Sequence, residues 1–347
     1  MKKVRVAING FGRIGRAFYK LARTRPEFEI VAVNDLGNLE SMAYLLKYDT
    51  VYGRADFDVQ VVPASDGVEP GFVVEGAKVI LVQEKDPTKL PWAKYGIDIV
   101  VESTGFFASY EKSKVHLGAG AKRVVITAPV KGEAVPGITG ATVLMGINEE
   151  KLTTCQISSN ASCTTNAASP IITILNETIG VEKAILNTTH AYTGTQKIVD
   201  GPSGRDLRDG RAGAQNIIPS STGAAIAVTE AVPELKGKFD GISLRVPVVA
   251  GSIADTTFIA KHNTTVDEVN KILRDAAKDP RWEGIFTTTD EPIVSSDVIG
   301  QLHGAIADLG LTRVVGGNLV KVLSWYDNEM GYTSTLVKHV VKVASYL

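Results

Sequence analysis

The sequence has few cysteines, no excess of either charge and no long apolar run. Its two cysteines, Cys155 and Cys163, lie eight positions apart, which does not suit a disulfide framework and indicates a reducing compartment. With 37 basic and 38 acidic residues, the formal charge of −1 argues against nucleic acid as the main partner. The basic residues 1–3 are not followed by the apolar core of a signal peptide, and no window suits a membrane span. We therefore expect a cytoplasmic protein that does not act at a membrane.

Length and strand spacing predict an α/β fold with two domains. A chain of 347 residues is long enough for about two domains. In the first half, short apolar strands alternate with helical segments, which predicts a Rossmann-type, doubly wound parallel sheet. These predicted strands cover residues 4–8, 29–33, 97–101, 123–126 and 143–145.

The second half has longer strand-like stretches, which predict an α+β catalytic domain with a mostly antiparallel sheet and helices on one face. They cover residues 183–191, 239–249, 252–260 and 319–325. We expect an NAD-binding domain at 1–161, completed by a C-terminal helix within 328–347, and a catalytic domain at 162–327. A loop as long as residues 194–218 is expected to be functional or to lie in an interface.

A glycine motif near the N-terminus has the context of a dinucleotide site. Gly10, Gly12 and Gly15 form G-x-G-x-x-G between a predicted strand and a predicted helix, and Asp35 ends the next strand. Such glycines permit a tight turn, close approach of a pyrophosphate and close helix packing. The Asp35 carboxylate would bind the ribose hydroxyls and repel a 2′-phosphate, which favours NAD over NADP. The alternative is a glycine-rich turn in a nucleotide-free α/β fold.

Cys163 and His190 are the candidate nucleophile and base. Cys163 precedes an apolar run at 167–179 that predicts a helix, and the start of a helix favours a thiolate. His190 lies at the end of a predicted strand, where sites form in α/β sheets. Each residue also has a structural alternative, because an isolated cysteine usually packs in the core and a strand-end histidine is often satisfied by its neighbours. Spacing alone does not pair them.

Six motifs occur in one order along the chain: NGFGRIGR at 9–16, ASCTTN at 161–166, HAYT at 190–193, STGAA at 221–225, RVP at 245–247 and WYDNE at 325–329. Together they resemble the phosphorylating glyceraldehyde-3-phosphate dehydrogenases over essentially the whole chain. The resemblance implies oxidation of D-glyceraldehyde 3-phosphate, with NAD and inorganic phosphate, to 1,3-bisphosphoglycerate. Cys163 would form a thiohemiacetal and then a thioester. His190 would lower the thiol pKa and take the hydroxyl proton.

The resemblance also implies binding residues, a homotetramer and no metal. For NAD these are Gly10, Gly12, Arg13, Ile14 and Gly15 near the pyrophosphate, Asp35 at ribose, Lys85 and Thr127 around the adenine half, Asn328 at the carboxamide and Tyr332 near the nicotinamide. For the substrate and phosphate they are Ser162, Thr164, Thr193, Thr222, Gly223 and Arg245. Lys85 and Thr127 stand where many relatives have Arg and Ser. Without the resemblance, Arg245 could be an ordinary ion-pair partner, and the hydroxyl residues could be helix caps.

Two other functions remain open at this point. An erythrose-4-phosphate dehydrogenase would share the cysteine and histidine chemistry but would release its thioester to water. A dinucleotide-sensing or RNA-binding module would keep the fold without the chemistry. The presence of Cys163, His190 and Arg245 together, and the near-neutral charge, argue against such a module.

Overall fold

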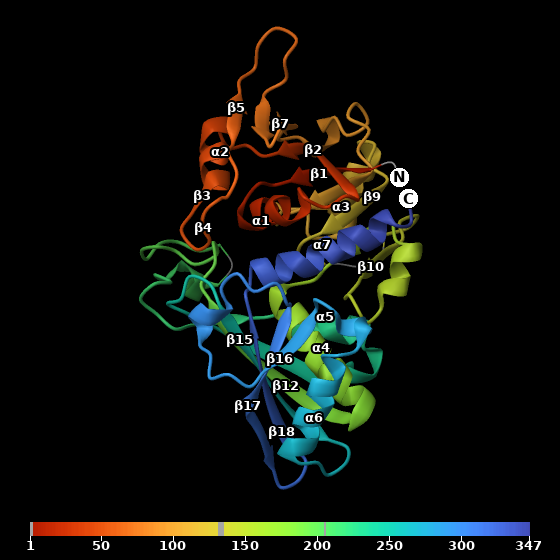
Figure 1. The fold of residues 1–347 in the computed structure, drawn as a ribbon, viewed down its shortest axis with the longest axis vertical. Coiled ribbons are helices and arrows are strands. Elements are labelled where there is room, and N and C mark those ends of the chain that lie inside the picture. The colour runs from red at the N-terminus through yellow and green to blue at the C-terminus, as the bar shows by residue number, and fades with distance from the viewer. Residues whose placement is uncertain (1–2, 131–134, 205) are drawn as a thin grey trace. The chain divides into compact units, whose positions relative to one another are not determined.

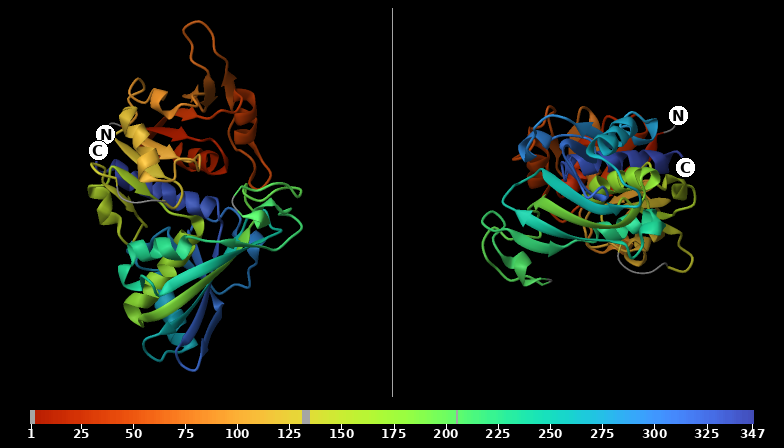
Figure 2. Two further views of the ribbon diagram at one scale, coloured as in Figure 1. Left: turned by 180° about the vertical axis from the view of Figure 1, so that it is seen from behind. Right: turned by 90° about the horizontal axis from the view of Figure 1, so that it is seen from below.

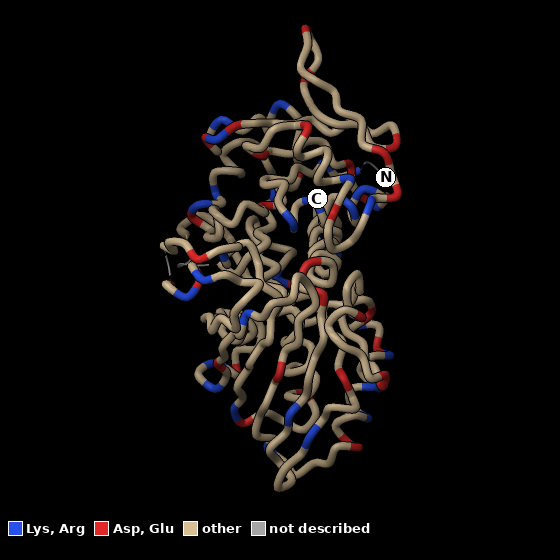
Figure 3. Tube along the Cα trace, turned by 90° about the vertical axis from the view of Figure 1, so that its left-hand side faces the viewer, with Lys and Arg blue, Asp and Glu red and all other residues tan. Residues whose placement is uncertain are grey.

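The computed structural model describes residues 3–130, 135–204 and 206–347. The chain forms two units. The first comprises Met1–Val143, Glu149–Ala161 and Leu336–Leu347, and the second comprises Leu144–Asn148 and Ser162–Thr335. In the described part of the chain, none of the helices has the length and apolarity of a membrane span. Lys and Arg are interspersed with Asp and Glu along both units (Figure 3).

The first unit is built on a largely parallel sheet of nine strands, counted within the described residues. Its order is β10-β11-β9-β8-β1-β2-β7-β6-β5, and the pairs β7–β6 and β6–β5 at one edge are antiparallel (Figure 1). The strands are β1 Val4–Asn9, β2 Phe28–Asn34, β5 Gln60–Val62, β6 Gly71–Val74, β7 Ala77–Val82, β8 Ile99–Glu102, β9 Arg123–Ile126, β10 Gly140–Thr142 and β11 Ile157–Ser159. All four residues of β8 are buried, as expected of a central parallel strand. The predicted Rossmann-type sheet is confirmed.

The helices of the first unit begin at residues suited to capping. They are α1 Arg13–Ala22, α2 Leu39–Lys47 and α3 Tyr110–Gly118, and a short ribbon pairs β3 Tyr48–Asp49 with β4 Gly53–Arg54. The side chains of Asn38 and Ser109 accept backbone hydrogen bonds at the starts of α2 and α3. Gly12, in contrast, gives α1 no side-chain cap. The first turn of α1 therefore keeps N–H groups for other partners.

The second unit has a mostly antiparallel sheet, as predicted. Its order over the described residues is β13-β14-β12-β15-β18-β17-β16, and only the pairs β12–β14 and β16–β17 are parallel. The strands are β12 Val181–Ala191, β13 Ile218–Ser221, β14 Phe239–Val246, β15 Ser252–Ala260, β16 Phe286–Thr289, β17 Ala305–Val315 and β18 Leu319–Tyr326. Burial alternates along β15, which is typical of a sheet covered on one face.

Helices cover one face of this second sheet. They are α4 Cys163–Thr178, α5 Ala224–Ala231 and α6 Val266–Ala276, and Figure 2 shows the sheet from behind them. The C-terminal helix α7, Met330–Ala344, begins in this unit and ends in the first. Short 3-10 turns occur at Pro87–Lys89, Glu149–Thr153, Leu207–Gly210, Pro233–Leu235, Pro280–Trp282 and Ser295–Val298.

The structure differs from the predicted elements in three places. Residues 143–145 are not a strand, because the ladder ends at Val143 and the side chain of Asn148 accepts a hydrogen bond from the N–H of Leu144 at 2.8 Å. Helix α4 starts at Cys163 rather than near residue 167, because Ser162 and Thr165 form a capping box. Residues 328–335 belong to the second unit, and only residues 336–347 of the C-terminal segment belong to the first.

Candidate active site

A cavity of about 510 Å³ lies at the carboxyl edge of the first unit's sheet. Among its lining residues are Gly10, Gly12, Asp35 and Lys85, all predicted to bind NAD. The backbone of Gly10 has φ +92°, and an added Cβ would come within 2.7 Å of the Thr104 nitrogen. A Cβ at Gly12 would meet no atom within 4 Å, so the chain leaves open space there. The cavity therefore meets exposed backbone at the glycine turn.

The Asp35 carboxylate binds the backbone on both sides of the cavity. Its Oδ2 accepts from the N–H of Phe11 at 2.7 Å and its Oδ1 accepts from the N–H of Gly37 at 2.9 Å. These bonds hold the end of β2 against the glycine turn. Asp35 thus shapes the cavity whatever else it binds.

The remaining residues predicted to bind NAD in this unit lie outside the cavity lining. Gly15 packs behind the turn, where an added Cβ would lie 2.1 Å from the Gly10 oxygen. Arg13 forms an ion pair with Asp49 at 2.6 Å. Ile14 is half-buried in α1, and Thr127 follows β9, where its N–H donates to the Glu102 carbonyl oxygen.

Cys163 is the first residue of α4 and is positioned by its neighbours. Ser162 caps the helix, since its Oγ accepts from the N–H of Thr165 at 3.1 Å. Ala161, just before the cap, has φ +54°, a left-handed conformation that costs a non-glycine residue about 1 kcal/mol. Strained backbone of this kind is often found at functional sites.

The structure brings His190 and Arg245 to Cys163. The Cys163 Sγ lies 3.3 Å from His190 Nε2. Strands β12 and β14 pair in parallel, with His190 opposite Arg245. The Nη1 of Arg245 lies 2.6 Å from His190 Nδ1, which also lies 2.6 Å from the Ala191 carbonyl oxygen. Three residues from three elements thus form one cluster in the second unit.

Hydrogen-bond chemistry makes the two contacts at His190 Nδ1 mutually exclusive. A guanidinium only donates, so when Arg245 binds Nδ1 the ring proton lies on Nε2 and faces the Cys163 sulfur. When Nδ1 carries the proton, it donates to the Ala191 oxygen and Nε2 is free to accept the thiol proton. Only the second arrangement makes His190 a base toward Cys163.

The electrostatic surroundings keep the thiol and imidazole neutral. Burial raises the pKa of the Cys163 thiol, and the charge of Arg245 and the N–H of Thr164 oppose this effect. Burial, followed by the charge of Arg245, lowers the pKa of His190 to about 3. The sequence predicted a lowered pKa for the thiol. That prediction is wrong in direction, because the helix start lies in a buried environment.

Arg245 carries a buried donor for which the described residues provide no acceptor. Its Nε is inaccessible to solvent and has no hydrogen-bond partner among them. Buried guanidinium donors are normally paired, and a planar fork of N–H groups fits a phosphate or carboxylate. The unsatisfied Nε therefore indicates an anion site beside His190.

The other predicted substrate residues have local partners in the described chain. Thr193 Oγ1 lies 3.0 Å from Thr195 Oγ1, and Thr222 Oγ1 accepts from the Ala224 N–H at 3.2 Å. Gly223 is the N-cap of α5, and a Cβ there would meet nothing within 4 Å. Among the residues described, no printed hydrogen bond joins Thr193, Thr222 or Gly223 to the cysteine cluster.

Tyr326 is a buried residue of the cluster to which the sequence assigned no role. Its hydroxyl lies 3.0 Å from Thr164 Oγ1 and 2.8 Å from Thr188 Oγ1, and its ring lies 5.8 Å from the His190 ring, edge to face. Tyr326 thus orients Thr164 and supports His190. It follows Trp325 at the end of β18, and its place in the WYDNE motif was the only available signal.

Asn328 and Tyr332 lie in the second unit. The side-chain oxygen of Asn328 accepts from the Gly251 N–H at 3.1 Å and from Ser252 Oγ at 3.0 Å. The same Ser252 hydroxyl accepts from the N–H of Ala191, next to His190. Asn328 is therefore fixed by its oxygen. Tyr332 is buried in α7.

The described residues contain no cluster of three or more His, Cys, Asp or Glu side chains suited to a metal ion.

Comparison with known proteins identifies the family. The family model described as "Glyceraldehyde 3-phosphate dehydrogenase, NAD binding domain" matches residues 4–110, and the model for the C-terminal domain matches residues 162–328. The chain is 45% identical over 339 residues to glyceraldehyde-3-phosphate dehydrogenase of Clostridium pasteurianum, covering 96% of each chain. It is 45% identical to the Mycobacterium avium enzyme, with 99% of both covered, and 44% identical to glyceraldehyde-3-phosphate dehydrogenase 3 of Saccharomyces cerevisiae, with 98% of this chain and 99% of that protein covered. The chain belongs to the glyceraldehyde 3-phosphate dehydrogenase family.

Proposed function

We propose that the protein is an NAD-dependent, phosphorylating glyceraldehyde-3-phosphate dehydrogenase. It oxidises D-glyceraldehyde 3-phosphate and joins the product to inorganic phosphate as 1,3-bisphosphoglycerate. The observation that carries this proposal is the 3.3 Å separation of Cys163 Sγ and His190 Nε2, with Arg245 on the other ring nitrogen. Relatives with this name match almost the whole chain.

The residues of the first unit fit NAD, and we assign cofactor binding to this unit. The open space at Gly12 and the uncapped first turn of α1 suit a pyrophosphate, which helix N–H groups bind. The Asp35 carboxylate suits ribose hydroxyls and disfavours a 2′-phosphate. When bound, NAD supplies the hydride acceptor. Lys85 lines the same cavity and is assigned to the adenine half.

Cys163 and His190 carry the covalent chemistry in the second unit. The sulfur attacks the aldehyde carbon, and the thiol proton passes through His190 to the aldehyde oxygen, giving a thiohemiacetal. His190 then takes the hydroxyl proton as the carbon loses hydride, which leaves a thioester on Cys163. Attack by phosphate breaks the carbon–sulfur bond, and the imidazolium returns its proton to the departing thiolate.

Arg245 connects anion binding to the strength of the base. We infer that a phosphate group binds its guanidinium, with Thr164 and the hydroxyls and N–H of Ser162, Thr193, Thr222 and Gly223 as further donors. An anion there offsets the positive charge that lowers the pKa of His190. It also draws the guanidinium from Nδ1, so that Nδ1 is able to donate to the Ala191 oxygen. Phosphate therefore favours the proton-accepting form of His190.

A steady-state assay tests the proposal. With D-glyceraldehyde 3-phosphate and NAD, we expect NADH formation that requires added phosphate, and much less with NADP. Rapid NADH formation that ignores phosphate, above all with erythrose 4-phosphate, would support the hydrolytic alternative instead. The absence of NADH with either aldehyde would contradict both enzymes and leave the binding module.

We further propose a cytoplasmic homotetramer. In the segment 194–218, apart from residue 205, large apolar side chains are exposed, including Ile198 at 91% and Leu207 at 86%. Exposed apolar groups in so long a loop are typical of an interface. The two free thiols fit a reducing compartment. Light scattering tests the assembly, and a monomer at working concentration would contradict it.

A further inference from the structure

Three polar side chains end neighbouring strands of the first unit. The parallel register places Asn9 opposite Asn34 on one side and opposite Glu102 on the other. Asn9 and Glu102 are 1% and 2% exposed. Asn9 and Asn34 line the cavity, whereas Glu102 is not among its lining residues. A buried carboxylate therefore lies directly behind the wall of the dinucleotide cavity.

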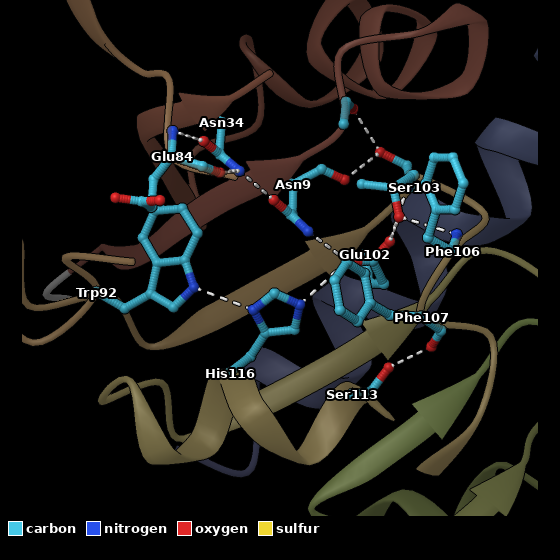
Figure 4. A network of polar contacts seen from close by, with 12 residues as sticks. Asn9, Asn34, Glu84, Trp92, Glu102, Ser103, Phe106, Phe107, Ser113 and His116 are labelled. Carbon is cyan, nitrogen blue, oxygen red and sulfur yellow. Dashed lines mark hydrogen bonds and ion pairs between the residues drawn. The ribbon is translucent and has the colours of Figure 1, made fainter. Parts of the chain in front are cut away.

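Glu102 accepts as many hydrogen bonds as a carboxylate normally can. One oxygen accepts from the amide nitrogen of Asn9 and faces His116 Nε2 at 3.0 Å. The other accepts from the N–H of Thr104 at 2.8 Å and from the hydroxyl of the same residue (Figure 4). Four donors directed at one side chain require an ionised acceptor, because a protonated or amide group would meet at least one of them with a donor of its own.

A tryptophan fixes the tautomer of His116. Trp92 Nε1 only donates, and it lies 3.2 Å from His116 Nδ1, which must therefore accept (Figure 4). The ring proton is then on Nε2 and is donated to Glu102. Both His116 and Trp92 are fully buried, so water does not replace these partners.

The same carboxylate orients the amides of the cavity wall. Asn9 gives its N–H to Glu102, so its oxygen is turned to accept from Asn34 at 2.8 Å. The Asn34 oxygen in turn accepts from the N–H of Glu84 at 3.0 Å. Every amide in this row thus has one orientation, and that orientation begins at the charge of Glu102.

Glu102 also holds the loop that follows β8 against the glycine turn. The Thr104 hydroxyl, bound to Glu102, accepts from the N–H of Phe106 at 3.0 Å. Ser103 Oγ donates to the Gly10 oxygen at 2.6 Å. Phe106, 78% exposed, and Thr104 both line the cavity. Both walls of the cavity thus depend on one buried acid.

We propose that Glu102, supported by His116, is a positioning residue for the dinucleotide: its buried charge sets the amide orientations and the loop position that NAD meets. The inference rests on the NAD-binding part of the proposed function. Replacement of Glu102 by Gln directs an N–H₂ group at the donors of Asn9 and His116. The wall is then forced to rearrange, and NAD binding weakens.

The two roles of His116 separate this proposal from a packing role. Its ring contacts Trp92 and Phe107, with centroids 6.4 and 5.7 Å apart. His116→Phe keeps a ring and loses both hydrogen bonds. His116→Gln loses the ring but keeps an oxygen to accept from Trp92 and an N–H to donate to Glu102. The hydrogen-bond role predicts greater damage from Phe, and the packing role predicts greater damage from Gln.

The test is the dissociation constant of NAD, measured by calorimetry on the full chain. Asp308→Asn is the matched control, because Asp308 is a buried acid of the second unit that accepts from Trp325 Nε1 at 3.0 Å. We expect Glu102→Gln and His116→Phe to weaken NAD binding about tenfold or more, and His116→Gln and the control less than about threefold. The rate of Cys163 alkylation without NAD should be unchanged in the Glu102 and His116 variants.

Two results would overturn the inference. One is NAD binding by Glu102→Gln within about twofold of the wild type, and the other is weaker binding by His116→Gln than by His116→Phe. The His116 pair decides the question alone if Glu102→Gln does not fold. A wild-type chain that does not bind NAD would overturn the proposed function together with this inference, whereas normal wild-type binding with unchanged variants would overturn the inference only.

Discussion

His116 in the first unit and His190 in the second are equally buried, but they face opposite partners. His116 lies between the indole N–H of Trp92 and the carboxylate of Glu102. His190 lies between the thiol of Cys163 and the guanidinium of Arg245. A carboxylate and a fixed donor hold an imidazole in one tautomer. A cation beside an imidazole opposes its protonation until an anion arrives. The partner, rather than burial, separates a positioning histidine from a reactive one.

The largest effect that follows from this comparison is the loss of turnover in Cys163→Ser. A serine hydroxyl is far less acidic than a thiol, and His190 cannot ionise it to a useful extent. We expect dehydrogenase activity to fall below detection while NAD binding, assigned to the first unit, stays within about twofold. Steady-state NADH formation and calorimetry measure the two. Cys155→Ser is the control, and loss of NAD binding in Cys163→Ser would contradict the division of roles.

A smaller but still large effect is expected at the base. His190→Asn removes the group 3.3 Å from the Cys163 sulfur and should lower kcat by about 10²- to 10⁴-fold, the usual contribution of a general base. Exposed His262, changed to Asn, is the control in the same unit. Alkylation of Cys163 by iodoacetamide should also slow and lose its response to added phosphate. A His190→Asn enzyme with nearly normal kcat would contradict the assignment.

Much of this comparison was predictable from the sequence, and its central contact was not. The glycine motif, Asp35 and the helix after Cys163 have local signals, because turns, caps and strand ends depend on nearby residues. The pairing of His190 with Arg245 depends on the parallel register of β12 and β14, which are separated by more than 40 residues of chain and carry no local signal. The family motifs supplied that pairing by resemblance.

The sequence gave no indication of how Glu102 is used. It ends a predicted apolar strand and precedes Ser-Thr-Gly, which is typical of an ordinary loop. Its partners Asn9 and His116 come from other elements. The raised pKa of the Cys163 thiol was mispredicted for a related reason, since the helix start was visible in the sequence and the burial around it was not.

The dinucleotide side of the comparison is sharpened by Asp35→Ala. The change removes the acceptor of the Phe11 and Gly37 N–H groups and the charge that disfavours a 2′-phosphate. We expect NAD binding to weaken about 10- to 100-fold and the preference for NAD over NADP to decrease. Calorimetry with both cofactors measures this, with exposed Asp66→Ala as the control. An unchanged preference would contradict the ribose assignment, even if affinity falls.

The smallest expected effect concerns acid stability, and it tests whether buried histidines without a carboxylate partner stay neutral. Burial lowers the pKa of His339 to about 3, and its ring contacts the Ser158 hydroxyl at 2.8 Å. Burial and Arg245 do the same for His190. Below the ordinary pKa of 6.5, the unfolded chain binds protons that the folded chain does not, so the free energy of unfolding falls as the pH drops from 6.5 toward 3. The loss is at most about 1.4 kcal/mol per pH unit for each histidine.

His339→Gln isolates one of these contributions within the first unit. Glutamine can still bond to Ser158 but does not titrate, so the variant should lose less stability than the wild type between about pH 6.5 and about pH 5. Urea denaturation at several pH values, at one protein concentration, measures the slope, and exposed His262→Gln is the control. Equal slopes for His339→Gln and the wild type would mean that the folded chain accommodates a charged His339, and that burial alone does not keep a histidine of this protein neutral.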